Sequence, residues 1–258
     1  MVWKTIKHVI RRILTVLPGG ATLIQKRANL IEKRRLARIG NAKQVFSHHY
    51  EVNAWDNEES VSGPGSTLEY TENIRKAIPQ LVKELGVSTI LDAPCGDFNW
   101  FRMIEWETEV SYVGGDIVEP LIERNQSLYA NQNREFINLD IVQDALPAAD
   151  LWLCRDCLFH LSNRDVMLVF NRFLKSDIRY LLTSIHSNCE KNLDIPTGSF
   201  RFINLQLPPF SLSKPAQVIE DWIEGYPPRQ LALWERETLK KDLVFNEAYW
   251  SAVKKRSQ

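Results

Sequence analysis

Residues 89–100 read TILDAPCGDFNW, and this stretch decides the fold. A short apolar run ends in Asp92, a tight turn containing Gly96 follows, and residues 98–106 predict a helix. This succession is the first half of a βαβ unit, in which a helix joins two parallel strands. In an open α/β sheet such a turn lies at the carboxyl end of its strand, where small ligands bind. Gly96 would let the backbone of the turn approach a bound molecule closely.

The same alternation continues along the chain. Apolar runs predict strands at residues 89–91, 111–114, 135–138, 151–154 and 180–184, and late strands at 230–236 and 248–253. Further helical patterns lie at residues 68–85, 120–130 and 164–176. Residues 46–70 have the composition of a loop. Strands that alternate with helices predict an α/β domain with a parallel sheet covered by helices.

Three acids lie at the ends of the first three strands. Asp116 ends the second strand, 24 residues after Asp92, and an acid at this place can accept both hydroxyls of a ribose. The third strand ends near Asp140, where an acid can face an adenine amino group. Each acid also has an ordinary explanation, because Asp92 and Asp116 can cap helices and Asp140 can be a surface acid.

Four ordered motifs carry a resemblance to a known family. They are LDAPCGDFNW (91–100), YVGGDI (112–117), FINLDIVQDALP (136–147) and ADLWLCRDCLFHLS (149–162). In this order and spacing they resemble class I S-adenosylmethionine-dependent methyltransferases, over residues 86–185 and more loosely over 60–85 and 186–236. The first motif is similar to that of a bacterial subgroup that reads PCGDFNW. Pro94 and Phe98 stand where the family usually has glycine, so either the subgroup shapes this turn differently or the site is degraded; the three acids favour a working site.

The resemblance implies a Rossmann-like class I methyltransferase fold, with a seven-stranded, mostly parallel sheet and helices on both faces. It also implies S-adenosylmethionine as the cofactor. At the methionine end it places Asp92 with the turn residues Ala93, Pro94, Cys95, Gly96 and Asp97. It places Asp116 at the ribose, and Ile117, Asp140 and Ile141 around the adenine. Beside the sulfonium it places Cys154 and Arg155.

Methyl transfer requires a nucleophile in line with the sulfonium methyl, exclusion of water and, for a hydroxyl, a base. We expect His160, which follows the fourth strand, to be this base, with Asp156 and His186 as the next candidates. A hydrogen-bonded structural histidine explains His160 equally well. His160 and the absence of an Asn/Asp-Pro-Pro-Tyr motif favour transfer to an oxygen of a small molecule or a glycan.

Two segments outside the core are candidates for closing the site. Residues 188–204 form a long polar stretch with Gly198, which predicts either a substrate loop or a surface excursion. Trp55 and the turn at residues 62–67 precede the core, from where they can close over the cofactor.

The charge of the chain is unevenly distributed. The 258 residues carry 32 Lys+Arg and 32 Asp+Glu, but residues 1–45 hold eleven of the basic residues and a single acid, Glu32. We therefore divide the chain into a basic helical extension, residues 1–45, and a methyltransferase domain, residues 46–258. Residues 3–17 predict a basic amphipathic helix and residues 21–38 a second helix. The extension is interpreted as an anchor on anionic membranes, or as a helix packed on its own domain or on a partner.

Composition and charge exclude several classes of protein. Hydrophobic residues make up 44% and charged residues 25%, which is typical of a globular domain. No apolar run approaches the roughly 20 residues of a membrane-spanning helix. The basic extension favours a nucleic-acid methyltransferase as one alternative, but the acidic body argues against nucleic acid as a partner. A non-catalytic, membrane-associated binding module is the other alternative.

The four cysteines predict reduced thiols in a cytoplasmic protein, with the inner face of the membrane as the alternative location. They are Cys95, Cys154, Cys157 and Cys189. The Cys154-Arg-Asp-Cys157 pair has no second pair at zinc-site spacing, so a redox or zinc role is only the alternative and no metal ligand is predicted.

Overall fold

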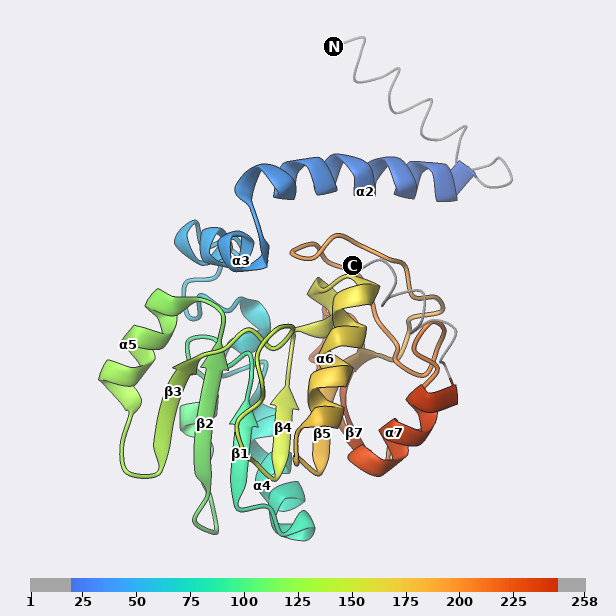
Figure 1. Ribbon diagram of the computed structural model, residues 1–258. Coiled ribbons are helices and arrows are strands. Elements are labelled where there is room, and N and C mark those ends of the chain that lie inside the picture. Colours follow the sequence, from blue (N-terminus) through green and yellow to red (C-terminus); the bar gives the residue numbers. More distant parts are fainter. Residues whose placement is uncertain (1–19, 246–258) are drawn as a thin grey trace.

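The computed structural model describes residues 20–245, which contain a seven-stranded sheet. Its strands are β1 (Thr89–Asp92), β2 (Ser111–Asp116), β3 (Arg134–Asn138), β4 (Leu151–Cys154), β5 (Tyr180–His186), β6 (Gln217–Glu220) and β7 (Arg229–Glu235). Their order across the sheet is β3-β2-β1-β4-β5-β7-β6. Strand β7 pairs antiparallel with β5 and β6, and the other pairs are parallel. The expected Rossmann-like class I methyltransferase fold is thereby confirmed (Figure 1).

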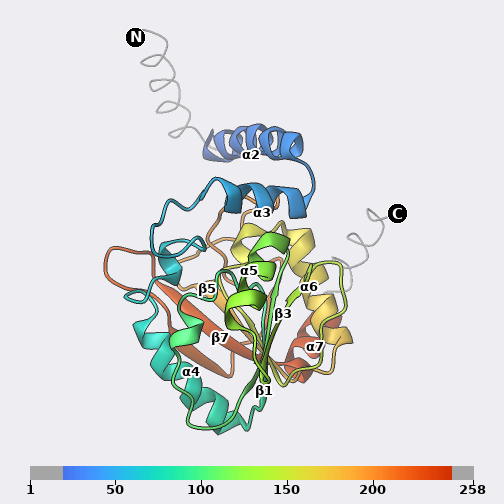
Figure 2. The ribbon, with the colours of Figure 1, turned by 90° about the vertical axis from the view of Figure 1, so that its left-hand side faces the viewer.

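Helices cover both faces of the sheet, as Figure 2 shows with the sheet nearly edge-on. They are α4 (Glu72–Leu85), α5 (Glu119–Tyr129), α6 (Asn163–Lys175) and α7 (Arg236–Phe245). Ile74 of α4 lies in the same core as Ile90, whereas Phe170 of α6 lies in the same core as Leu91. Ile90 and Leu91, which are neighbours on β1, thus face opposite cores, and both side chains are fully buried. Burial on both faces explains why the central strands β1 and β4 are almost entirely apolar.

Two further helices precede the sheet and lie above the carboxyl ends of the parallel strands in Figure 1. Helix α2 (Gly20–Ile39) confirms the helix predicted at residues 21–38. Helix α3 (Ala42–Glu51) shows that the loop predicted from residue 46 is wrong as far as residue 51. A reciprocal capping box between Asn41 and Gln44 starts α3 and stabilises it.

The described part of the basic extension packs on its own domain. Asn29 Nδ2 donates to the Asp194 carbonyl at 2.8 Å, and Leu36 is buried. Leu30 and Ile31, by contrast, are exposed. Membrane anchoring stays a prediction, and the helix predicted at residues 3–17 lies outside the described residues.

Two helix predictions in the domain are corrected. Residues 98–106 form only a short 3-10 helix, Phe101–Met103, because Phe98 takes a left-handed backbone conformation with φ of 59°. The Phe98 ring is 1% exposed and packs 5.0 Å from Tyr112 and 5.1 Å from Phe136 between ring centroids. Burial of this ring outweighs the backbone strain, which costs on the order of 1–3 kcal/mol. Helix α4 begins at residue 72 rather than 68, after a turn in which Thr71 Oγ1 donates to the Thr67 carbonyl.

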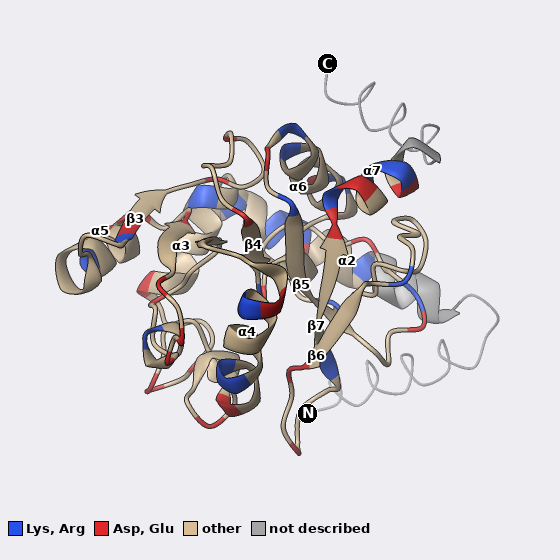
Figure 3. Cartoon of the chain, turned by 90° about the horizontal axis from the view of Figure 1, so that it is seen from below, with Lys and Arg blue, Asp and Glu red and all other residues tan. Residues whose placement is uncertain are grey.

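The C-terminal part contains elements that the sequence pattern did not reveal. Strand β7 confirms the strand predicted at 230–236, but β6 and α7 were not predicted, and residues 248–253 lie outside the described part. Seen from below, basic and acidic residues are interspersed over α4 and α7 (Figure 3). Among the helices of residues 20–245, none combines the length and the apolar character needed to cross a bilayer.

The aromatic core around Phe98 yields a stability prediction. Phe98→Ala removes a fully buried ring, so we expect the free energy of unfolding in urea to fall by about 3–5 kcal/mol. Leu128→Ala is the control, because Leu128 is 58% exposed on α5 and should change that free energy by no more than about 0.5 kcal/mol. Equal effects of the two substitutions would contradict the role assigned to this core.

Candidate functional site

A cavity of about 330 Å³ lies at the carboxyl ends of the parallel strands. The strand register brings these ends together, since Asp92 pairs with Gly114 and Leu153, and Cys154 with Thr183. Ligands of open α/β sheets bind at this edge, where the strand order reverses beside β1. Helix α3, residues 61–66, residues 155–161 and the start of β7 complete the cavity wall.

Hydrogen bonds join the turn after β1 to the segment 60–66. Asp97 Oδ1 accepts a hydrogen bond from Ser60 Oγ at 3.0 Å, and Ser62 Oγ accepts one from Asp97 N at 3.1 Å. Gly96 has φ of 55°, and a Cβ on it would collide with Ser62 Oγ. Only glycine therefore allows the segment to lie this close to the turn.

Two buried carboxyl groups line the cavity at the ends of β1 and β2. Asp92 accepts a hydrogen bond from the Tyr112 hydroxyl at 2.9 Å, and burial raises its pKa to about 8. Asp116 accepts hydrogen bonds from the Gly96 and Val118 N–H groups at 3.1 and 3.0 Å. Burial raises the pKa of Asp116 to about 6. Buried carboxylates are costly to ionise, so this half of the cavity favours a ligand that brings positive charge and hydroxyl donors.

The structure separates the other residues predicted at the cofactor into two groups. Those that line the cavity are Pro94, Cys95, Gly96, Ile117, Asp140, Ile141 and Arg155. Ala93, Asp97 and Cys154 lie outside its lining. The Ala93 carbonyl accepts from the Trp152 indole, and the Cys154 carbonyl accepts from Thr183 Oγ1. These three residues therefore hold the sheet edge and the 60–66 segment together.

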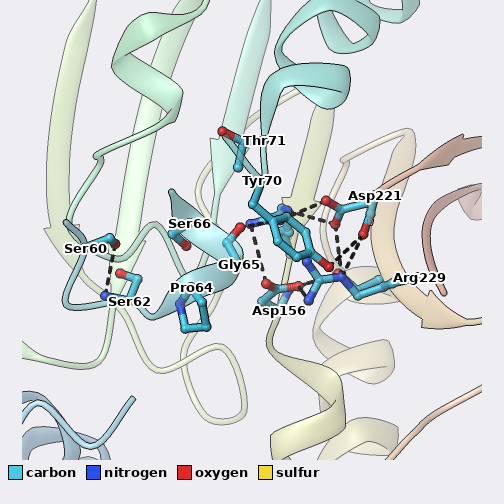
Figure 4. Close-up of polar contacts among 12 residues, drawn as sticks. Ser60, Ser62, Pro64, Gly65, Ser66, Tyr70, Thr71, Asp156, Asp221 and Arg229 are labelled. Carbon is cyan, nitrogen blue, oxygen red and sulfur yellow. Dashed lines mark hydrogen bonds and ion pairs between the residues drawn. The ribbon is translucent and has the colours of Figure 1, made fainter. Parts of the chain in front are cut away.

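Four charged side chains of alternating sign form a network beside the cavity (Figure 4). Asp221 is fully buried and accepts from Arg155 Nη2 at 2.8 Å and Nε at 3.0 Å, and it pairs with Arg229 Nε at 3.2 Å. Arg229 Nη1 also pairs with Asp156 at 2.9 Å. Burial alone would raise the pKa of Asp156, but Arg155 and Arg229 outweigh it and hold that pKa below its ordinary value. A carboxylate held in this way is a weak base.

The two predicted histidines line the cavity in opposite tautomers. His160 Nδ1 lies 2.8 Å from the Ser199 carbonyl, which can only accept, so Nδ1 carries the proton and Nε2 a lone pair. His186 Nδ1 accepts from the Ile203 N–H at 3.3 Å, which leaves the proton on its Nε2. Burial lowers the pKa of His160 and lowers that of His186 to about 4. Both rings are therefore neutral at pH 7, and His160 is the one that can accept a proton.

Aromatic rings wall the part of the cavity around these histidines. Phe159 lies 4.6 Å from His160 and 5.5 Å from Phe200 between ring centroids, and Trp55 lies 6.3 Å from His160. Phe200 belongs to the polar stretch 188–204, and it lines the cavity as the substrate-loop prediction requires. Trp55 and residues 62–66 also line it, from the N-terminal side expected.

Several site residues had no signal in the sequence. Asp221 and Arg229 lie in a stretch without a recognisable motif, and they reach the site only because β7 pairs antiparallel with β5, which sets Arg229 beside His186. Phe46 and Tyr50 line the cavity from α3, in a segment predicted to be a loop. The capping box that starts α3 was the signal available for finding that helix.

The similarity of this chain to known proteins lies in its fold. No protein-family model matches the chain, and no curated protein matches it. Among solved structures, the chain is similar to magnesium protoporphyrin IX methyltransferase (ChlM) from Synechocystis PCC 6803 with bound S-adenosylmethionine. That alignment has a TM-score of 0.49 and 17% identity and covers 75% of this chain and 96% of that chain.

Two further alignments are weaker. The N-methyltransferase NodS from Bradyrhizobium japonicum WM9 aligns with a TM-score of 0.46 and 12% identity, over 64% of this chain and 98% of that chain. A possible exported protein from Bordetella parapertussis aligns with a TM-score of 0.39 and 15% identity, over 46% of this chain and 44% of that chain. Identities this low leave the chemistry of the cavity to be inferred from its own residues.

The raised pKa of Asp92 makes stability depend on pH. The folded protein holds this proton more tightly than the unfolded chain, where Asp titrates near 3.9, so stability falls as pH rises from about 4 to about 8. One group contributes at most about 1.4 kcal/mol per pH unit. Asp92→Asn should flatten this dependence in urea unfolding and stabilise the protein at pH 8.

Glu84→Gln, an exposed acid of α4, is the control and should leave the pH dependence of unfolding parallel to that of the unaltered protein. An Asp92→Asn variant with the same dependence would contradict the assignment of the buried proton.

Proposed function

We propose that this protein transfers a methyl group from S-adenosylmethionine to an oxygen of a small-molecule or glycan acceptor. The observation that carries the proposal is that one cavity holds two buried carboxyl groups with raised pKa values and a neutral histidine with a free Nε2 lone pair. The carboxyl groups of Asp92 and Asp116 suit a cationic cofactor with a ribose diol. The His160 ring suits proton removal from a hydroxyl.

The cavity residues can hold the cofactor in a defined orientation. Asp116 accepts hydrogen bonds from the ribose hydroxyls, and Ile117 and Ile141 provide apolar contacts for the adenine. Asp92, once ionised, offers negative charge to the sulfonium end. When bound, S-adenosylmethionine supplies a methyl group on a positively charged sulfur.

His160 then acts on the acceptor. The cofactor would supply its methyl carbon to the acceptor oxygen, and the bond between that carbon and sulfur would break with its electron pair remaining on sulfur. The hydroxyl proton passes to His160 Nε2, and the resulting imidazolium is stabilised by the nearby negative charge of Asp156. The aromatic rings of Trp55, Phe159 and Phe200 exclude water from this end of the cavity.

Cofactor binding tests the first half of the proposal. In isothermal titration calorimetry, Asp116→Ala should weaken the affinity for S-adenosylmethionine by about 10- to 100-fold, because two hydrogen bonds to a charged group are lost. Glu123→Ala, an exposed acid on α5, should bind it like the unaltered protein. If the unaltered protein fails to bind, or binding is indifferent to Asp116→Ala, the proposal is overturned.

The same titration separates the sulfonium from the rest of the cofactor. Below pH 8, Asp92 gains a proton and loses its attraction for the cation, so affinity for S-adenosylmethionine should fall with pH by up to about tenfold per unit. S-Adenosylhomocysteine has an uncharged sulfur and should show a weaker dependence over pH 6.5–8.5. Identical pH profiles for both ligands would remove Asp92 from the sulfonium site.

Proton removal is tested with His160→Ala. We expect kcat for methyl transfer to hydroxylated metabolites and glycosides to fall by about 10²- to 10⁴-fold, with the affinity for S-adenosylmethionine unchanged. The fall in rate at acidic pH, where His160 becomes protonated, should disappear in the variant, and burial of the ring, which lowers the pKa of His160, shifts this fall to lower pH than for an ordinary histidine. His48→Ala, which alters a histidine outside the cavity lining, is the control. Full activity of His160→Ala would assign the base elsewhere.

A further inference from the structure

Arg229 carries an unused hydrogen-bond donor in the wall of the cavity. Its Nε and Nη1 pair with Asp221 and Asp156, whereas its Nη2 is buried and has no hydrogen-bond partner among the described residues. The guanidinium is 4.9 Å from the centroid of the Tyr70 ring, which fixes its plane. A buried donor normally has a partner, so an unpaired one in a cavity wall points to a ligand.

Gly65 lies directly against this donor and against Asp156. A Cβ on Gly65 would lie 2.8 Å from Asp156 Oδ2 and 3.3 Å from Arg229 Nη2, so only glycine lets the backbone approach both side chains this closely. Gly65, Asp156 and Arg229 all line the cavity. An acceptor, Asp156 Oδ2, and a donor, Arg229 Nη2, therefore lie close together at this point of the cavity wall (Figure 4).

The net charge of the network indicates whether the group bound beside Arg229 is charged or neutral. Two arginines and two aspartates cancel, so no net field favours an anion or a cation there. An ion would lose its hydration without gaining a counter-charge. A neutral hydroxyl loses little hydration free energy, because its O–H can donate to Asp156 Oδ2 while its oxygen accepts from Arg229 Nη2.

The aromatic residues of the adjoining cavity wall indicate which kind of molecule contains this hydroxyl. Phe159, Phe200 and Trp55 present aromatic surface around His160, and such surface packs against the apolar C–H face of a sugar ring. Phe200 is 56% exposed and Tyr226 is 41% exposed, although both line the cavity. The aromatic end is therefore also the mouth, which suits an acceptor that continues into solvent.

We propose that the methyl acceptor is a neutral sugar of a glycan, whose ring packs on Phe159 and Phe200 while one hydroxyl bridges Asp156 Oδ2 and Arg229 Nη2. A second hydroxyl of the same ring faces His160 Nε2 and receives the methyl group. This assignment rests on the proposed function, since it takes methyl transfer to oxygen as given. Arg229 and Asp156 act here as residues that select and position the acceptor.

The test uses the full chain saturated with S-adenosylhomocysteine, and binding is measured by saturation-transfer NMR. The probes are methyl glycosides of neutral hexoses and 6-deoxyhexoses, the matching methyl hexuronides, and phenol. Neutral glycosides should bind at least tenfold more tightly than the hexuronides or phenol. Preference for the anionic or phenolic probes, or binding of none of them, would overturn the proposal. Failure of the protein to bind S-adenosylhomocysteine would instead overturn the proposed function.

Two variants locate the sugar site without removing a charge. Gly65→Ala crowds Asp156 Oδ2 and Arg229 Nη2 with a methyl group, and Phe200→Ala removes an exposed ring from the mouth. Each should weaken glycoside binding by about tenfold or more while S-adenosylhomocysteine affinity stays the same. Leu193→Ala, an exposed residue of the same loop outside the cavity, is the matched control. Unchanged glycoside binding in both variants would contradict the proposed position.

Discussion

The shape of the cavity depends on the carboxylate of Asp221. This group is completely buried and shared by Arg155 at the end of β4 and Arg229 at the start of β7, while Arg155 Nη2 also donates to the Gly65 carbonyl at 2.7 Å. Burying ions costs hydration free energy, which is offset only where opposite charges alternate and their hydrogen bonds are satisfied. The two arginines and two aspartates alternate as this condition requires, and among the buried polar atoms of these four side chains only Arg229 Nη2 lacks a hydrogen-bond partner within residues 20–245. One contact thus joins the parallel core, the antiparallel edge and the N-terminal segment.

This network divides the cavity into two chemically different halves. Beside β1 and β2, the buried carboxyl groups of Asp92 and Asp116 form no ion pair with an arginine of residues 20–245, and their pKa values are raised. Beside β4, β5 and β7, every aspartate of the network is neutralised by an arginine, and the histidines are uncharged. A cation is therefore favoured in the first half and a neutral, hydroxylated molecule in the second. These are the requirements of a methyl donor and of its acceptor in the proposed reaction.

The sequence predicted the parallel core well because most of its strands are short, largely apolar runs that end in a polar residue or are followed by one. It failed where packing overrides local preference, as at Phe98, whose left-handed backbone is stabilised by burial of its ring. It failed also where a strand carries no pattern, as in β6, whose residues are mostly exposed. The site was found at Asp92, Asp116 and His160 because these residues follow strands. Asp221 was missed because nothing in its local sequence marks it, and Tyr50 was missed because the Asn41–Gln44 capping box, the one local sign of α3, was not recognised.

By itself, the sequence determined the α/β class, the positions of the core strands along the chain and the acids at their ends, since these follow from local periodicity and from the rule that parallel strands end at one edge. Only the tertiary structure decided the order of the strands in the sheet, the tautomers of His160 and His186, the pairing of Arg155 and Arg229 with Asp221, and the close approach of Gly65 to Asp156 and Arg229. These features depend on contacts between segments far apart in the chain, such as Gly65, Asp156 and Arg229. Their distances are set by the packing of the whole sheet, which no local pattern encodes.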